Sequence, residues 1–343
     1  MLEKPDLADV RIISALASHY AISVRRLEFL PVGNDQRAWA YRVEAVGGAF
    51  FLKLRKGGTK TASLIAPRYL RAQGIEQVIA PLATVSGALL ARDCGYDFIL
   101  YPYIAGKSAW RMSISVSQWR AWGAVMRRIH SCALSPEARD ATEREVFGVK
   151  WQTTIDRVEV ALRRGDYHGP VAAEAARVWR DQDEEIQRCR RRYRELGALL
   201  AAAPPPFALC HADIHTANII IDSQGELRIV DWDETLLAPK ERDLMFFIDD
   251  GHETQETEAF FAGYDGGEIN WLALAYYKYD WVVQEFGDYG ERLFLSDEIG
   301  GKDLESALRE FKRLFEPGDV IDRAQRCFQR MLREPAYSHI SVG

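Results

Sequence analysis

The spacing of apolar residues changes along the first sixty positions of the chain. Residues 5–20 carry apolar side chains three or four positions apart, which predicts a helix. Short apolar runs follow at residues 24–32, 39–46 and 49–54, and these runs predict three strands. Gly47 and Gly48 lie between the last two runs and predict a two-residue hairpin turn. The chain is therefore expected to begin with a helix and a small sheet.

The pattern stays mixed up to residue 100 and then becomes mainly helical. A helix is expected at residues 61–73, despite Pro67, and strands are expected at 79–83, 88–91 and 97–101. Beyond residue 106 helical spacing predicts helices at 117–132, 151–164, 171–203, 253–262, 268–286, 303–315 and 319–333. We therefore predict an α+β protein with a small mainly-β lobe (residues 1–100), a connector (residues 101–106) and a large mainly-α lobe (residues 107–343).

Polar residues cluster directly after short apolar runs in the stretch 209–233, LCHADIHTANIIIDSQGELRIVDWD. One predicted strand is followed by His211, Asp213 and Asn218, and a later strand is followed by Asp231 and Asp233. Loops at strand ends commonly carry chemistry. Carboxylates brought together without a partner repel each other, and a bound metal ion would offset that repulsion. We therefore expect the active site in this stretch.

The spacing of Asp213 and Asn218 suits phosphoryl transfer. An aspartate can accept a hydroxyl proton while an asparagine on the same loop holds the metal ion. Asp231 follows the next strand and is expected to supply a metal-binding carboxylate. The structural alternative is a polar loop that caps a sheet, with an aspartate that only caps a turn.

Lys53 lies inside the apolar run Phe50–Leu54, and a buried lysine is rare unless it is paired. On a strand its side chain points away from Leu52 and Leu54, so it is expected to face a cleft. The alternative is an edge-strand lysine that deters aggregation. The loop with Gly33, Asn34 and Asp35 is a weaker signal, although such loops offer backbone N–H groups to phosphate.

The charge and composition of the chain argue against two classes of protein, nucleic-acid-binding proteins and membrane-anchored proteins. The net charge of −6 predicts no general attraction to nucleic acid or to anionic membranes. Five dispersed cysteines, no signal-like N-terminus and no apolar stretch of membrane-spanning length favour a cytoplasmic protein without an anchor. Residues 243–268 hold eight acidic and no basic side chains, so this segment either attracts a cationic substrate or forms a solvated surface.

In this order, the motifs resemble the aminoglycoside phosphotransferase family, whose members share a two-lobed, protein-kinase-like fold. The resemblance rests on HADIHTAN at 211–218, IVDWD at 229–233, FLK at 51–53 and YPYI at 101–104. Residues 33–41, 237–246 and 280–290 are most similar to the spectinomycin phosphotransferase branch.

The resemblance implies that ATP binds between the lobes, with adenine against the connector residues Tyr101, Pro102, Tyr103 and Ile104. Lys53 would contact the α- and β-phosphates. Asn218 and Asp231 would hold Mg2+, and Asp213 would orient and deprotonate the acceptor hydroxyl. One departure is that family members usually pair the lysine with a helix glutamate, whereas residues 61–73 contain no acid. Either another acid such as Glu76 pairs with Lys53, or the phosphates alone position it.

The leading hypothesis is an ATP-dependent phosphotransferase that acts on a hydroxyl of an aminoglycoside or aminocyclitol antibiotic such as spectinomycin. The expected partner is a cationic small molecule, and the expected state is a monomer or weak dimer. One alternative is a kinase of another small hydroxylated metabolite or antibiotic. Another is a metal-dependent hydrolase that uses His211, Asp213 and His215 as ligands. A third is a kinase-like binding protein without turnover.

Overall fold

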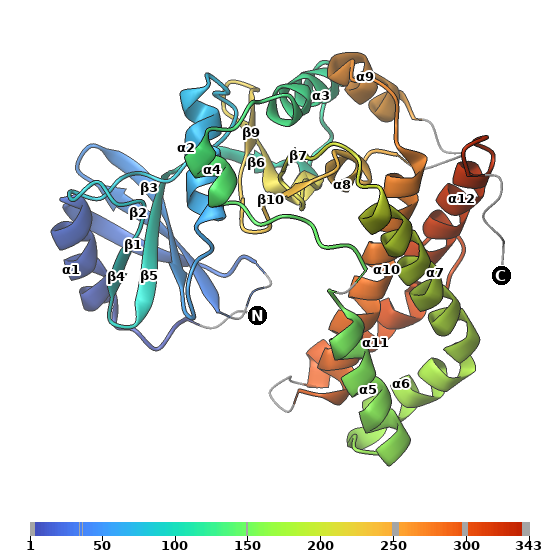
Figure 1. The fold of residues 1–343 in the computed structure, drawn as a ribbon. Coiled ribbons are helices and arrows are strands. Elements are labelled where there is room, and N and C mark those ends of the chain that lie inside the picture. Colours follow the sequence, from blue (N-terminus) through green and yellow to red (C-terminus); the bar gives the residue numbers. More distant parts are fainter. Residues whose placement is uncertain are drawn as a thin grey trace. The chain divides into compact units, whose positions relative to one another are not determined.

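The computed structural model describes residues 4–33, 35, 37–148, 150–248, 254–296 and 301–337, together with the backbone but not the side chain of Lys302. The chain forms two compact units (Figure 1). Unit 1 comprises Met1–Arg144, Ala208–Leu237 and Gln255–Gly266, and unit 2 comprises Glu145–Phe207, Ala238–Thr254 and Gly267–Gly343. The predicted boundaries follow function instead: residues 1–100 as a nucleotide-binding lobe, 101–106 as the connector and 107–343 as a catalytic and substrate-binding lobe. They remain a prediction.

A five-stranded antiparallel sheet forms the first part of unit 1. Its strands run in the order β1-β2-β3-β5-β4, with these bounds: β1 Val24–Leu30, β2 Ala38–Ala45, β3 Gly48–Arg55, β4 Ala91–Asp93 and β5 Tyr96–Pro102. The predicted hairpin between the second and third strands is present. Ala45 pairs with Gly48, so the turn residues are Val46 and Gly47, one position earlier than predicted. Gly47 has a φ of 99°, which favours glycine.

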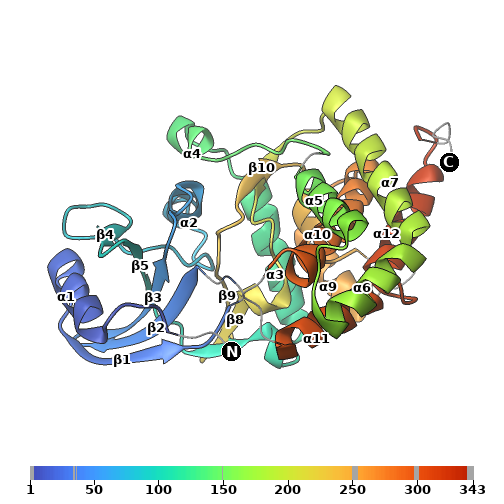
Figure 2. The same cartoon turned by 90° about the horizontal axis from the view of Figure 1, so that it is seen from below.

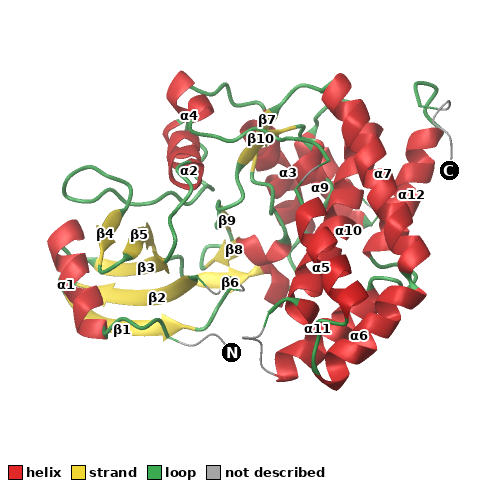
Figure 3. Ribbon diagram, turned by 60° about the horizontal axis from the view of Figure 1, so that its bottom comes forward, coloured by secondary structure: helices red, strands yellow, loops and turns green. Residues whose placement is uncertain are grey.

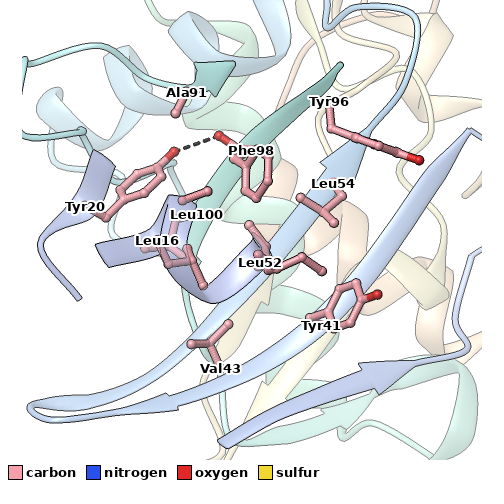
Figure 4. Close-up of a cluster of buried hydrophobic side chains, with 12 residues drawn as sticks. Leu16, Tyr20, Tyr41, Val43, Leu52, Leu54, Ala91, Tyr96, Phe98 and Leu100 are labelled. Carbon is pink, nitrogen blue, oxygen red and sulfur yellow. Dashed lines mark hydrogen bonds between the residues drawn. The ribbon is translucent and has the colours of Figure 1, made fainter. Parts of the chain in front are cut away.

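Helix α1 (Asp9–Tyr20) covers one face of this sheet and supplies four of the twelve buried residues of its core (Figure 4). Leu16 of the helix and Leu52 of β3 are fully buried in this core, and Tyr20 donates a hydrogen bond of 2.7 Å to the carbonyl oxygen of Phe98. Because strand side chains alternate, burial of Leu52 and Leu54 against α1 directs Lys53 to the opposite face. The core thus fixes the orientation of the predicted phosphate-binding lysine.

Two predicted strands of the first hundred residues are wrong. Residues 79–83 form no strand, because Pro81 has no N–H to give to a ladder and, of these residues, only Leu82 bonds to β5, through the Leu100 carbonyl. The strand predicted at 88–91 instead begins at Ala91 as β4. The predicted helix at 61–73 is present as α2 (Ala62–Ala72), with Pro67 inside it.

The rest of unit 1 holds two small sheets and several helices. One sheet has the order β6-β8-β9, and the other pairs β10 with β7. Their bounds are β6 Gly106–Ser108, β7 Ala208–Cys210, β8 Ile219–Asp222, β9 Leu227–Ile229 and β10 Leu236–Ala238. The helical elements are η1 Ala109–Arg111, α3 Val116–His130, α4 Pro136–Asp140, η2 Thr216–Asn218 and α9 Gln255–Tyr264. Helices α3 and α9 approach closely at Gly123 and Gly263, where any side chain would meet the other backbone.

Unit 2 is a helical bundle built around α10 (Trp271–Phe294), which packs against the other helices of the unit (Figure 2). These helices are α5 Gln152–Arg164, α6 Gly169–Asp181, α7 Asp183–Ala202, α8 Glu241–Leu244, α11 Gly301–Arg313 and α12 Val320–Leu332. The single helix predicted at 171–203 is wrong, because the chain breaks at Gln182. Three acids, Asp183, Glu184 and Glu185, begin α7 there and complement the positive end of a helix dipole.

The α+β fold class is confirmed, with a mainly-β N-terminal part followed by mainly helical chain (Figure 3). Across the described ranges, none of the helices combines the length and apolarity that crossing a bilayer requires.

Candidate active site

His211, directly after β7, joins the two polar loops of unit 1. Its ring is fully buried, lies against Trp232 and makes a 2.9 Å hydrogen bond through Nε2 to the carbonyl oxygen of Val230. Its Nδ1 accepts a hydrogen bond of 3.3 Å from the backbone N–H of Asp213. Both nitrogens are therefore engaged by backbone groups, which is consistent with a proton on Nε2. This histidine ties the loop after β7 to the end of β9.

Asp213 and Asn218 are held together in the same loop. The side-chain Nδ2 of Asn218 donates to the Asp213 backbone oxygen at 2.8 Å and to its carboxylate at 3.0 Å. Asn218 is buried at the end of η2, whereas the Asp213 side chain is 43% exposed. Because the asparagine nitrogen is committed to Asp213, its amide oxygen is the atom suited to ligate a cation.

The ionisation of Asp213 is coupled to that of His215, whose Nε2 lies 3.4 Å from the carboxylate. Burial alone raises the pKa of Asp213, but the hydrogen bond from His215 and the neighbouring charges outweigh it and hold the pKa below its usual value of 3.8. The hydrogen bond to Asp213 raises the pKa of His215 above 6.5, against the opposing effect of burial. Asp213 is therefore ionised near neutral pH and able to accept a proton.

Two residues beside this site adopt left-handed backbone conformations without being glycine. Ala212 has a φ of 68° and Asp231, which follows β9 closely, has a φ of 63°. Such conformations are strained for residues with a Cβ and concentrate at functional sites. The loops are also tied directly, since the backbone N–H of Val230 donates to the oxygen of Asn218 at 3.0 Å. The metal-binding candidates Asn218 and Asp231 are thereby brought close together.

Lys53 on β3 reaches the end of β9. Its Nζ lies 2.9 Å from Asp231 Oδ1 and 2.8 Å from Asp233 Oδ2, and its side chain is only 14% exposed. Burial alone lowers the pKa of Lys53, but the two carboxylates outweigh this effect and raise it. Within the described residues, Lys53 forms ion pairs with these two carboxylates and not with Glu76.

Asp233, expected in this stretch without a defined role, and Arg55, which no motif singled out, also belong to this site. The Arg55 guanidinium pairs with Asp233 and also lies 3.3 Å from Asp35 Oδ2. Arg55 stands two residues beyond Lys53 on β3, so the two side chains share one face. That spacing was the signal available in the sequence. We call Lys53, Arg55, Asp231 and Asp233 the strand-end cluster.

The connector residues lie beside the strand that carries Lys53. Tyr101 and Pro102 end β5, which pairs with β3, and burial raises the pKa of the Tyr101 phenol. Tyr103 and Ile104 follow, and the guanidinium of Arg42 lies 4.8 Å from the centre of the Tyr103 ring. The connector is thus continuous with the sheet of unit 1.

The predicted phosphate loop is described in part. Gly33 has a φ of 95° and open space around it, as a loop that exposes its backbone requires. Asp35 accepts a 2.8 Å hydrogen bond from the backbone N–H of Arg37 and pairs with Arg55. Asn34 lies outside the described residues.

Comparisons with a family model and with solved structures both identify phosphotransferases. The model of the phosphotransferase enzyme family matches residues 26–277, which is more than half of the chain. The structure is similar to spectinomycin phosphotransferase APH(9)-Ia in complex with ADP and spectinomycin, with a TM-score of 0.82 and 25% identity over 95% of this chain and 100% of that chain. No similar sequence was found among curated proteins.

Two further structures share the fold at lower identity. An aminoglycoside phosphotransferase from Alicyclobacillus acidocaldarius subsp. acidocaldarius has a TM-score of 0.58 and 14% identity, over 98% of each chain. A microcompartment-associated aminopropanol kinase has a TM-score of 0.61 and 14% identity, over 94% of this chain and 98% of that chain. The family resemblance and the kinase-like fold inferred from the sequence are confirmed. The chain belongs to the phosphotransferase enzyme family and is a phosphotransferase that acts on hydroxyl groups.

Proposed function

We propose that this protein transfers the γ-phosphoryl group of ATP to a hydroxyl of an aminoglycoside or aminocyclitol antibiotic such as spectinomycin. The observation that carries the proposal is the convergence of four side chains in unit 1. Lys53 pairs with Asp231, Asn218 bonds to Asp213, and the two loops are joined by the bond from Val230 to Asn218. Phosphoryl transfer uses this combination of a cation, two metal ligands and a proton acceptor.

Lys53 is suited to the α- and β-phosphates of ATP. Its ammonium is largely buried and stays protonated, because Asp231 and Asp233 raise its pKa. A buried cation exerts a stronger electrostatic attraction on phosphate than one in water. Gly33, Asn34 and Asp35 are proposed to border the phosphates, and Tyr101, Pro102, Tyr103 and Ile104 are proposed to receive adenine.

Asn218 and Asp231 are suited to hold Mg2+. An amide oxygen and a carboxylate are the hard oxygen ligands that this ion takes in nucleotide sites. The Asp231 side chain is 48% exposed, and so it can reach a ligand beyond its ion pair with Lys53. When bound, the ion would neutralise charge on the transferring phosphoryl group.

Asp213 is proposed to act on the acceptor. Its carboxylate is ionised, half-exposed and held by Asn218, so it can accept a hydrogen bond from a hydroxyl group. The acceptor oxygen then forms a bond to the γ-phosphorus while the bond from that phosphorus to the bridging oxygen of ADP breaks. The hydroxyl proton passes to Asp213. The products are ADP and a phosphorylated acceptor.

The proposed acceptor class rests on the similarity to the spectinomycin phosphotransferase, which spans nearly the whole of both chains. The acidic segment 243–268, of which residues 249–253 lie outside the described part, favours a cationic acceptor. ATP is abundant in the cytoplasm, and we propose that the enzyme works there as a monomer or weak dimer.

An ATP-consumption screen tests this function. The panel should contain spectinomycin, several aminoglycosides and simple metabolite alcohols, each with and without Mg2+, and Asp213→Asn should serve as the matched inactive control. We expect Mg2+-dependent ADP release with an aminocyclitol or aminoglycoside, and mass spectrometry should show one added phosphate. Turnover confined to the metabolite alcohols would overturn the antibiotic assignment.

A kinase of another small hydroxylated metabolite is the second candidate, because the aminopropanol kinase shares the fold. The same screen separates the two classes. The hydrolase hypothesis is less well supported, because both ring nitrogens of His211 are engaged by the protein backbone and the ring is fully buried. Zinc or manganese that copurifies in stoichiometric amounts would revive it.

A further inference from the structure

The structure provides Lys53 with partners other than a helix glutamate. Helix α2 has the sequence ASLIAPRYLRA and carries no acid. Ser63, near the position where family members carry the glutamate, is buried and donates its hydroxyl hydrogen bond to the Lys60 carbonyl oxygen at 2.8 Å. Asp231 and Asp233 pair with Lys53 instead. Asp231 is the proposed magnesium ligand, so Asp233 is, within the described residues, the carboxylate that can stay with Lys53.

Asp233 has the position expected of a shared anchor. Its Oδ2 atom contacts both Lys53 Nζ and the Arg55 guanidinium. Its side chain is 23% exposed, against 48% for Asp231, so it is the more enclosed of the two carboxylates. Charge-assisted hydrogen bonds with partly buried partners are stronger than bonds between neutral groups, and they fix the geometry of both cations.

Arg55 has the position expected of a second phosphate contact. It shares a face of β3 with Lys53, and its side chain is 23% exposed. Its other ion pair is to Asp35, in the loop proposed to border the phosphates. A guanidinium can bind phosphate with two parallel N–H donors, which a lysine cannot do.

We propose that Arg55 acts with Lys53 as a second phosphate-binding cation, and that the shared Asp233 carboxylate positions both. This inference rests on the proposed function, since it requires a nucleotide phosphate as ligand. Asp233 takes the place of the missing helix glutamate. Lys53 therefore keeps a counter-ion when Asp231 turns to a metal ion, and Arg55 exchanges its contact with Asp35 for the phosphate.

Calorimetric titration with ADP and with adenosine, both in EDTA, tests the role of Arg55 without acceptor or metal. We expect Arg55→Gln to weaken ADP binding by about 10- to 100-fold, as for loss of a charged hydrogen-bonding partner, and to leave adenosine binding unchanged. Arg55→Lys should retain part of the ADP affinity. Arg26→Gln is the matched control, because Arg26 makes surface ion pairs on β1 and should not change the affinity for ADP.

The role of Asp233 is tested by a double-mutant cycle with the same titration. If Asp233 holds the guanidinium in place, Arg55→Gln should cause a smaller loss of ADP affinity in the Asp233→Asn background than in the wild-type protein. Strictly additive losses would overturn the positioning role. Equal ADP binding by wild-type protein and Arg55→Gln would overturn the phosphate contact, whereas a wild-type protein that binds ADP neither in EDTA nor in Mg2+ would overturn the proposed function itself.

Discussion

Two clusters of charged side chains, one in each unit, use the same chemistry in different ways. In the strand-end cluster of unit 1, Lys53 and Arg55 meet Asp231 and Asp233. In the second cluster, Arg190 of α7 meets Glu159 and Asp156 of α5, at 2.5 and 2.6 Å, and its guanidinium also donates to Gln152 at 3.1 Å. Both clusters pair buried or partly buried cations with carboxylates, but only the first lies at strand ends beside the predicted catalytic loop.

Both clusters keep one accessible carboxylate, since Asp156 is 63% exposed and Asp231 is 48% exposed. The difference is that Asp231 lies beside the loop that carries Asn218. Arg190 is a residue of a helix pair, its side chain is 8% exposed, and three side chains of α5 share its guanidinium. Its contacts link two segments of unit 2. In the strand-end cluster the carboxylate of Asp231 is 48% exposed and can exchange its lysine for a ligand. We therefore expect changes in the first cluster and its loop to affect ligands and turnover, and changes in the second to affect stability.

The largest expected effect follows from Asp213→Asn, which removes the proposed proton acceptor from the loop. The rate constant kcat should fall by about 10²- to 10⁴-fold, the usual contribution of a general base. ADP affinity and thermal stability should change little, because the asparagine can still accept the bond from Asn218. Steady-state kinetics and ADP titration measure both quantities. Full turnover by this variant would exclude Asp213 as the base.

The next largest effect is expected for the proposed magnesium ligands. Asp231→Asn should weaken the Mg2+-dependent part of nucleotide binding by about 10- to 100-fold, as losses in metal sites generally do. Asn218→Ala should weaken the same Mg2+-dependent part of nucleotide binding, and so should resemble Asp231→Asn more closely than Asp213→Asn does. Titrations with ADP in Mg2+ and in EDTA isolate that part. An Asp231→Asn protein with unchanged Mg2+ dependence would contradict the assignment.

Arg190→Met tests whether the charged cluster of unit 2 affects stability and not ligands. It should lower the free energy of unfolding by about 1–3 kcal/mol, because the Glu159 side chain is only 18% exposed and would lose a charged partner. The KM for ATP should not change. Arg157→Met is the matched control, since the ion pair of Arg157 with Glu291 lies in the same unit and its side chains are 59% and 53% exposed. Chemical denaturation measures both variants, and equal losses would show that burial of the cluster is unimportant.

The smallest expected effect concerns the carboxyl group of Glu285 on α10. Burial raises its pKa above the usual 4.5, although the hydrogen bond from Trp281 acts in the opposite direction. A carboxyl whose folded-state pKa is raised releases its proton more readily when unfolded, so its contribution to stability falls as pH rises from 4.5 through the folded-state value.

The free energy of unfolding of Glu285→Gln should therefore exceed that of the wild-type protein by about 0.5 kcal/mol near neutral pH, and this difference should disappear below pH 4.5. Unfolding free energies across that range test the sign. A variant that is less stable at every pH would show that the charged carboxylate is favourable where it lies.

The sequence predicted most elements whose periodicity is strong and missed those that depend on distant partners. The alternation around Lys53 predicted the direction of its side chain, because Leu52 and Leu54 had to be buried. The three-residue strands β6 and β10 were not predicted, since such short segments form only through pairing with β8 and β7. The break at Gln182 was missed because residues on both sides of it have helical spacing.

The candidate site was predicted residue by residue, but its ion pairs were not. Asp213 and Asn218 lie in one short loop, so their contact follows from local spacing. Lys53 and Asp233 are separated by 180 positions, and no periodicity in a single sequence reports such a contact. The partner of Lys53 was therefore sought among nearby acids such as Glu76, whereas the fold supplies two carboxylates from the end of β9.

The left-handed conformation of Ala212 restricts the orientation of the neighbouring Asp213 side chain. Glycine would adopt this φ of 68° without strain, yet the chain has a methyl group there. A glycine would also give the loop many more conformations before folding and more ways to move afterwards. The methyl group removes those choices, so the loop keeps Asp213 pointed in one direction at the expense of some local strain. This single methyl group therefore gives the turn a fixed orientation of Asp213 and not an unstrained backbone.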